Sequence, residues 1–254
     1  MSLNVAAYHF AAIDDPEALA AQCFERAEAA ALLGTILIAP EGINIVLAGD
    51  DVLLRSFIAE LLADMRFANM RPKFSSSESV PFARLKVKVK PEIISFRQDD
   101  SQPLDNERAP ALKPADLARW IAQGHDDDGR RLQLLDTRNR EEVHYGSFTD
   151  ALALDIDNFT ELPQAIAPHL DSLSDAAVVS FCTGGVRCEK AALWLRGQGL
   201  ENVWQLDEGI LGYFEQVGGE GYDGACFVFD ERLALTPDLK PISDQAIDDQ
   251  PKNQ

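Results

Sequence analysis

One short stretch constrains the fold of this chain more than any other. An apolar run from Ala176 to Phe181 ends at Cys182, a glycine-containing turn follows, and Cys188 to Gln198 has the pattern of a helix. A continuous apolar strand followed directly by a helix is typical of a parallel sheet that helices cover on both faces. The stretch therefore predicts an α/β domain with Cys182 at the carboxyl end of a strand, where ligands bind in sheets of this class.

The region around this stretch, about residues 113 to 235, repeats the alternation of strands and helices. Short apolar runs predict strands at residues 132–135, 151–154, 177–182 and 203–206. Helical patterns occupy residues 114–123, 159–170, 188–198 and 209–217. The first of these helices has a proline at its start and stops at Gly124, as helices commonly do. We expect this region to form one domain with a mostly parallel sheet.

The first region, residues 1 to 96, has a different pattern. A helix predicted from Pro16 places Leu19, Cys23 and Ala27 on one face. A second helix begins near Asp50, a good N-cap residue, and carries an apolar stripe of Leu54, Phe57, Ile58, Leu61, Leu62 and Met65. Strand-like runs lie at residues 3–10, 35–39, 43–47, 71–74 and 85–96. The order β-α-β-β-α-β predicts a ferredoxin-like α+β sandwich.

The remaining segments are polar. Residues 97–112 are acidic, contain two prolines and separate the two patterns, so we predict a linker. Residues 236–254 are polar, acidic and contain proline, and we predict that this tail is disordered. The first residues do not resemble a signal peptide, and no apolar run approaches the roughly 18 residues of a membrane span. With four cysteines in 254 residues, we expect free thiols and a cytoplasmic protein.

Charge is distributed unevenly along the chain. The net charge of −19 argues against a broadly basic nucleic-acid binder, because phosphate contacts need Lys and Arg. Between Arg66 and Arg97, however, eight basic and two acidic residues give a net charge of +6. The basic residues Arg84, Lys86, Lys88 and Lys90 alternate with apolar ones, so all four share one strand face. They either form a solvated face or bind an anionic partner.

The turn after Cys182 has the composition of an anion-binding loop. Gly184 and Gly185 are able to adopt positive φ values and curl the backbone N–H groups into a cradle. The following helix directs its positive dipole end at the same place, and Arg187 adds charge. A cysteine there is expected to have a lowered pKa and to be partly thiolate, the nucleophilic form. The alternative is a glycine turn with a buried structural thiol.

The spacing of the loop distinguishes two chemistries. Cysteine phosphatases place an arginine six positions after the cysteine, and their longer loop encloses a whole phosphate. Here Arg187 lies five positions after Cys182, and the sixth position is Cys188. The shorter loop therefore favours a persulfide or another small group over a phosphoryl group.

The other three cysteines receive different predictions. Cys188 lies on the apolar face of the following helix, so we expect a core residue, with a resolving thiol for Cys182 as the alternative. Cys23 lies on a helix stripe and is expected in a core. Cys226 receives no assignment from the sequence.

Several blocks together resemble the rhodanese domain. They are Leu134 to Arg138, Glu142, Gly146, Phe148, Cys182 to Arg187, and Val203 to Gly209. More narrowly, CTGGVRCEKA, the upstream EGIN, the RLKVKVK run and the later FVFDER resemble the rhodanese-related tRNA uridine hydroxylases. The resemblance extends to about Leu235.

This resemblance implies a function that composition and spacing do not. It implies oxygen-dependent 5-hydroxylation of the wobble uridine, uridine 34, of tRNA. Cys182 is then the catalytic, persulfide-capable residue, and molecular oxygen and an unidentified electron donor are co-substrates. The implied active-site loop is Thr183, Gly184, Gly185, Val186 and Arg187. The implied first domain, residues 1–96, is ferredoxin-like or acylphosphatase-like and helps to bind tRNA.

The chain departs from the family pattern at three places. The usual Gly-His pair after the acidic residue is Gly146-Ser147, and the usual late Gly-Gly pair is Glu208-Gly209. A cysteine-rich C-terminal extension found in longer members does not occur up to Gln254, so we expect no metal role of that kind. The first two departures leave the expected fold unchanged but alter the rim of the loop.

Two charged residues near the expected site have alternative roles. Asp136 and Arg138 end a strand next to the cysteine loop in the family fold. Our hypothesis is that Asp136 anchors the loop and Arg138 supports anion binding. The alternative is a structural ion pair.

The sequence contains no pattern typical of a bound cofactor. The four histidines are scattered, and neither paired Cys-x-x-Cys motifs nor a phosphate-binding Gly-Lys loop occurs. We therefore expect neither a metal nor a nucleotide cofactor. Two alternatives to hydroxylation stay open: a sulfurtransferase that passes a Cys182 persulfide to a thiol acceptor, and a non-catalytic rhodanese module that binds a partner.

Overall fold

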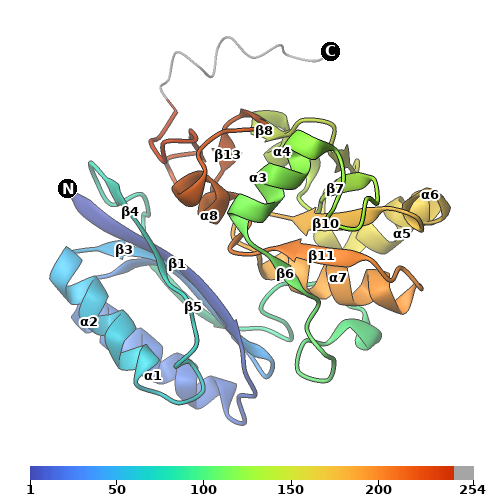
Figure 1. Cartoon of the computed structure of the whole chain (residues 1–254). Helices are drawn as coiled ribbons and strands as arrows, with labels where there is room; N and C mark the ends of the chain where they lie inside the picture. The colour runs from blue at the N-terminus through green and yellow to red at the C-terminus, as the bar shows by residue number, and fades with distance from the viewer. Residues whose placement is uncertain (243–254) are drawn as a thin grey trace. The chain divides into compact units, whose positions relative to one another are not determined.

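The computed structural model describes residues 1–242, which divide into two compact units (Figure 1). The first unit contains Met1–Glu107, and the second begins at Arg108. None of the described helices is long and apolar enough to cross a membrane.

The first unit is a five-stranded sheet with two helices on one face. Its elements are β1 (Ser2–Phe10), α1 (Pro16–Ala29), β2 (Leu33–Ala39), β3 (Gly42–Gly49), α2 (Asp51–Leu62), β4 (Lys73–Ser77), β5 (Leu85–Val89) and the short 3-10 helix η1 (Asp99–Ser101). The strand order is β4-β1-β3-β2-β5. β5 is parallel to β2, and the other neighbouring strands are antiparallel. The predicted β-α-β-β-α-β order is confirmed, with β5 as an additional edge strand.

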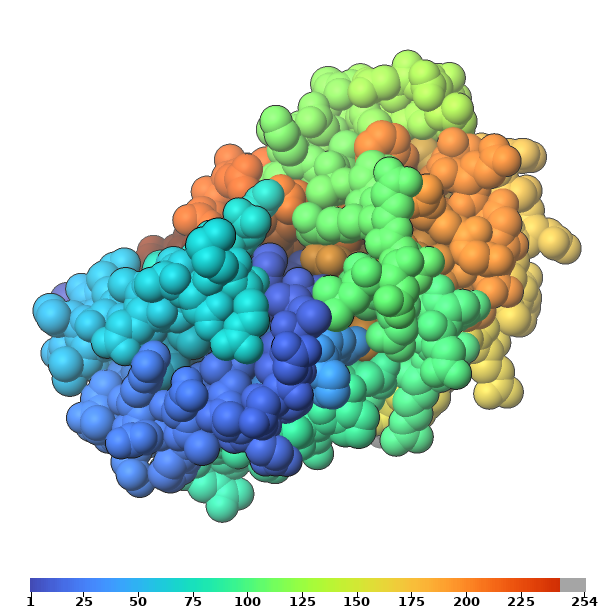
Figure 2. Space-filling model, turned by 90° about the horizontal axis from the view of Figure 1, so that it is seen from below, coloured from blue at the N-terminus to red at the C-terminus, as the bar shows by residue number. Residues whose placement is uncertain are grey.

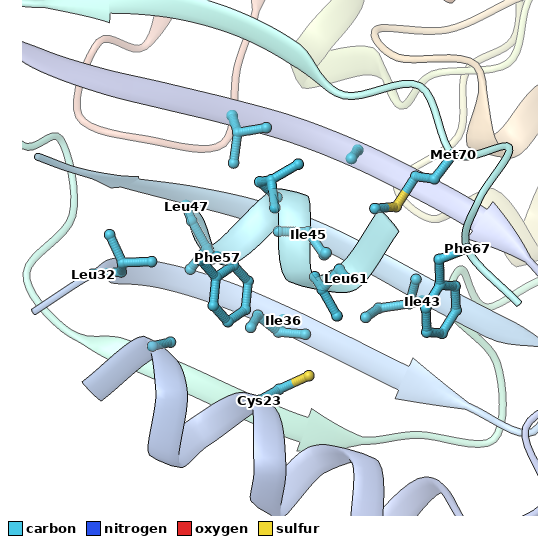
Figure 3. Close-up of a cluster of buried hydrophobic side chains, with 14 of the residues drawn as sticks. Cys23, Leu32, Ile36, Ile43, Ile45, Leu47, Phe57, Leu61, Phe67 and Met70 are labelled. Carbon is cyan, nitrogen blue, oxygen red and sulfur yellow. The ribbon is translucent and has the colours of Figure 1, made fainter. Parts of the chain in front are cut away.

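The core of the first unit lies between the sheet and its two helices. Leu19, Cys23 and Ala27 are buried on α1, as the helical spacing predicts. Figure 3 shows Cys23 pointing into a cluster formed by side chains of the sheet and α2. Figure 2 shows the side of this unit that α1 covers. Met65 was expected in the α2 stripe but is 87% exposed, because the helix ends at Leu62.

The second unit is an α/β sheet with two additional two-stranded antiparallel sheets. Its strands are β6 (Ala111–Leu112), β7 (Leu132–Asp136), β8 (Gly146–Phe148), β9 (Leu152–Ala153), β10 (Ala177–Phe181), β11 (Val203–Leu206), β12 (Tyr222–Gly224), β13 (Cys226–Phe227) and β14 (Ala234–Leu235). Its helices are α3 (Pro114–Gln123), α4 (Arg140–Tyr145), α5 (Leu162–Ile166), α6 (Leu170–Leu173), α7 (Val186–Gly197) and α8 (Gly209–Gln216), with the 3-10 helices η2 (Phe159–Glu161) and η3 (Ala167–His169).

The main sheet of the second unit has the order β6-β11-β10-β7-β9, and all its neighbouring strands are parallel. Leu117 of α3 and Ile210 of α8 share a core with Val179 on one face. α7 packs against β10 and β11 on the other face (Figure 1). The predicted parallel sheet covered by helices is therefore confirmed.

Three sequence-based boundaries need correction. Ala111 and Leu112, assigned to the linker, form β6 and pair with β11. The strand predicted at 85–96 ends at Val89. The tail predicted to be disordered is ordered over residues 236–242, where a turn is closed by backbone bonds from the N–H of Thr236 to Lys240 and from Ile242 to Ala234. Residues 243–254 lie outside the described part of the chain.

Candidate active site

The cysteine loop lies at the carboxyl end of the central strand. Cys182 directly follows β10, and α7 begins four residues later at Val186. Gly185 is the N-cap of α7 with φ of 100°, a conformation that favours glycine. Gly184 does not have the positive φ that we predicted, and a Cβ added to it would meet nothing within 4 Å. Only one of the two glycines is therefore required by the backbone of the loop.

The sulfur of Cys182 lies in a cradle of hydrogen-bond donors. The backbone N–H of Gly185 donates to it at 3.1 Å, and the N–H of Arg187 and the thiol of Cys188 donate as well. Burial raises the pKa of Cys182, but the Cys188 thiol, the charge of Arg187 and the two N–H groups outweigh burial and lower the pKa to about 6. The thiolate, predicted from the sequence, is thus the stabilised form. Cys182 itself is fully buried, whereas Thr183, Gly184 and Val186 are partly exposed.

The guanidinium of Arg187 is engaged by a carboxylate. Its two terminal nitrogens donate to the two oxygens of Glu142, each at 2.6 Å. Both residues are buried, which makes this a bidentate buried ion pair. Arg187 therefore acts on Cys182 through its charge and backbone N–H, while its side chain fixes the loop to α4.

Glu142 belongs to α4 and was missed as a site residue. It completes a capping box, in which Asn139 accepts from the N–H of Glu142 and Glu142 accepts from the N–H of Asn139. The Thr183 hydroxyl oxygen also lies 3.4 Å from one of the carboxylate oxygens of Glu142. The Asn-x-x-Glu spacing gives the capping box in the sequence, but the contact with Arg187 spans 45 residues and has no local signal.

The first turn of α8 holds the loop from the other side. The N–H of Ile210 donates to the carbonyl of Cys182 at 2.9 Å, and the N–H of Leu211 donates to that of Thr183 at 3.1 Å. Gly209 packs so closely that a Cβ on it would lie 2.6 Å from the Cys182 oxygen. Glu208, where the family usually has glycine, has a left-handed φ of 63°. The late glycine that remains, Gly209, is thus the one that contacts the loop.

Asp136 and Arg138 form the ion pair that was the structural alternative. The Arg138 guanidinium donates to both carboxylate oxygens of Asp136, at 2.9 and 2.6 Å, and both side chains are fully buried. Arg138 also donates to the carbonyl of Gly146 at 2.7 Å. Ser147, which stands where the family usually has histidine, donates to Asp136 at 2.7 Å. This network ties β7 to β8 beside the loop.

The four cysteines occupy different environments. Burial and the neighbouring Cys182 raise the pKa of Cys188, so Cys188 keeps its proton and donates to Cys182. Cys226 lies against the loop, with its sulfur 3.8 Å from the Thr183 hydroxyl, and burial raises its pKa to about 12. Cys23 is a core residue of the first unit, as predicted. Sequence reasoning missed Cys226, because its partner lies 43 residues away.

Comparison with known proteins identifies both units and the chain as a whole. Residues 2–93 match the UPF0176 acylphosphatase-like domain, and residues 114–216 match the rhodanese-like domain. A protein named tRNA uridine(34) hydroxylase from Xanthomonas campestris pv. campestris (strain 8004) is 63% identical over 97% of both chains. One with the same name from Xylella fastidiosa (strain 9a5c) is 56% identical over 96% of this chain and 95% of its own. The chain belongs to the tRNA uridine(34) hydroxylase family.

In this member of the tRNA uridine(34) hydroxylase family, the cysteine loop lies within the rhodanese-like match and the basic strand lies within the UPF0176 match. β5 is an edge strand that pairs only with β2, and its Leu85 and Val87 pack against the core. Backbone bonds of Arg84 and Lys90 with β2 continue the ladder at both ends. Arg84, Lys88 and Lys90 are exposed, and Lys86 is partly exposed. The predicted basic strand face therefore exists.

Residues 1–242 of this hydroxylase family member contain no group of three or more His, Cys, Asp or Glu side chains arranged to hold a metal ion. The loop donors around Cys182 instead surround a single sulfur atom. What the arrangement is able to stabilise is negative charge on that sulfur or on a small group attached to it.

Proposed function

We propose that this protein catalyses the oxygen-dependent 5-hydroxylation of uridine 34 in tRNA, with Cys182 as the catalytic residue. The observation that carries the proposal is the identity of 56–63% with proteins named tRNA uridine(34) hydroxylase over nearly the full length of the chain. The stabilised thiolate of Cys182 supports it at the level of chemistry. We place the reaction in the cytoplasm, with tRNA as the partner.

Hydroxylation at C5 replaces a C–H bond with a C–O bond. With molecular oxygen as oxidant, one oxygen atom enters the base and the other leaves as water, which requires two electrons and two protons. We propose an external electron donor as the second co-substrate. The active-site loop, Thr183, Gly184, Gly185, Val186 and Arg187, holds Cys182 as a thiolate or persulfide throughout.

The surroundings of the loop have positioning roles in this proposal. The Glu142–Arg187 pair fixes one side of the loop, and the first turn of α8 fixes the other. The Asp136–Arg138 pair sets the end of β7 beside it. Cys188 donates a hydrogen bond that favours the Cys182 thiolate.

The basic strand face, Arg84, Lys86, Lys88 and Lys90, is proposed to contact the tRNA backbone. The four cations alternate along one edge strand, and such a row is well suited to successive phosphates. Phosphate contacts position the RNA without reading its sequence, so base recognition must come from another part of the protein.

The proposal is tested by analysis of tRNA from a strain that lacks the gene. We expect nucleosides derived from 5-hydroxyuridine at position 34 to disappear in the deletion strain and to return with the wild-type gene, as measured by mass spectrometry of digested tRNA. Unchanged nucleosides on deletion would refute the hydroxylase function. In that case a cyanide and thiosulfate assay separates the sulfurtransferase from a non-catalytic rhodanese module.

A further inference from the structure

An aromatic row lies beside the cysteine loop. Neighbouring rings of Tyr145, Phe227 and Phe229 have centroids 5.3 and 5.1 Å apart, and His144 continues the row at 5.9 Å from Tyr145. These residues come from α4 and from the segment that begins with β13, two elements that are distant in the sequence. The row is therefore assembled by the fold and is absent as a sequence motif.

A hydrogen bond joins the aromatic row to Thr183, the residue that follows Cys182. The hydroxyl of Thr183 donates to the carbonyl of Phe227 at 3.3 Å. Phe227 itself is buried, and the row rises from it to the exposed Phe229 on one side and the partly exposed Tyr145 on the other.

Phe229 is exposed and precedes a well-closed turn. It is 65% exposed and is the one large hydrophobic side chain of residues 108–242 that belongs to the exposed class. The turn that follows is fixed by Asp230, which accepts from the N–H of Arg232 at 2.9 Å and pairs with its guanidinium. A bond from the N–H of Val228 to Leu233 closes the hairpin at 2.8 Å. A single exposed apolar side chain is ordinary. Phe229, however, packs edge-on against Phe227 and directly precedes a turn that a nearly buried ion pair closes, so ordering it on binding costs little entropy.

We propose that the surface rings of this aromatic row, His144, Tyr145 and Phe229, supported from below by the buried Phe227, are a stacking platform for unpaired bases of the tRNA anticodon loop, with Phe229 as the main contact. The inference rests on the proposed function, since it assumes that the substrate base is in a single-stranded RNA loop. Proteins recognise such loops by stacking splayed bases on aromatic side chains. Because the row adjoins Thr183, a base stacked on it lies next to the loop that carries Cys182.

The test measures binding of a synthetic anticodon stem-loop RNA to the full chain. Phe229→Ala is expected to weaken binding by about 5- to 150-fold, the range for loss of one base–aromatic stack. Phe229→Trp is expected to retain binding, because tryptophan also stacks. Phe24→Ala is the control, because Phe24 on α1 is also exposed, at 41%, and lies outside the row.

A second RNA separates stacking from other effects. The second RNA is a stem-loop whose loop nucleotides lack bases. For this RNA, Phe229→Ala and the wild-type protein are expected to have equal affinities. An equal loss on both RNAs, or wild-type affinity of Phe229→Ala for the intact stem-loop, would overturn the inference; so would a Phe229→Ala variant that binds RNA normally and loses only a protein partner. These results are independent of the nucleoside assay. Wild-type RNA affinity of Phe229→Ala together with normal 5-hydroxyuridine formation overturns the inference alone. Weakened binding of Phe229→Ala together with nucleosides that are unchanged on deletion of the gene overturns the proposed function alone.

Discussion

The reactive state of Cys182 depends on a few neighbouring atoms. Its strand-end position, the following turn and its lowered pKa were predictable from the sequence, because they are local features of ten residues. The Glu142 contact of Arg187 was not predictable, because it joins residues 45 positions apart. The sequence allowed a positive φ at both Gly184 and Gly185, and only Gly185 has one, because a glycine pair does not reveal which member adopts that conformation.

The pKa of Cys182 gives a prediction at this scale. The folded pKa of about 6 lies below the ordinary thiol value, so the thiolate fraction should rise as the pH increases through about 6. Cys188→Ala removes the thiol donor and should move this titration to higher pH. The ultraviolet absorbance of the thiolate, taken as the difference from a Cys182→Ser variant, measures the titration midpoint of the wild type and of Cys188→Ala. Cys23→Ala is the control and should leave the midpoint unchanged.

Two glycines of the site should respond differently to alanine. Gly209→Ala forces a left-handed φ of 64° on alanine and places its Cβ against the Cys182 carbonyl, so we expect a loss of about 1–3 kcal/mol in stability. Gly184→Ala has open space and an ordinary φ, and its stability should change by less than about 0.5 kcal/mol. Thermal denaturation measures both variants. Equal melting temperatures would contradict the close packing of Gly209 on the loop.

At the scale of elements, two short strands carry the proposed RNA contacts. The cations of β5 lie on the face opposite Leu85 and Val87, which pack against the core, so these cations are exposed or partly exposed. β13 pairs only with β14, and its short hairpin lies against the cysteine loop. The sequence predicted the alternation of β5, whereas the two-residue strands of the hairpin are too short to produce a period that can be detected.

The basic strand face gives a prediction for RNA binding. Lys86→Glu with Lys88→Glu should weaken tRNA binding and lower its salt dependence, because each lost phosphate contact removes about 0.7–0.9 from the slope of log K against log salt. Filter binding or anisotropy at several salt concentrations measures this slope. Arg26→Glu, on the outer side of α1, is the control and should leave the slope unchanged. If the slope of log K against log salt were the same for the wild type and all variants, β5 would not contact the tRNA backbone.

At the scale of the whole molecule, the sequence predicted two regions with different periodicities, and the structure has an α+β unit and a parallel α/β unit. These were predictable because amphipathic helices and buried strands leave periodic patterns. The small sheets β8–β12 and β13–β14 were not predictable, because their strands are too short to show such a period and because β8 and β12 are far apart in the sequence. The ordered conformation of residues 236–242 was not predictable either, because it depends on backbone hydrogen bonds such as that from Ile242 to Ala234.

The central claim is that Cys182 carries out the hydroxylation of uridine 34. The most direct measurement is complementation of the deletion strain with Cys182→Ala and, as matched control, Cys23→Ala, followed by mass spectrometry of the position-34 nucleosides. We predict that Cys23→Ala restores 5-hydroxyuridine derivatives and that Cys182→Ala, expressed to the same level, does not. Restoration by Cys182→Ala to the wild-type amount would contradict the claim.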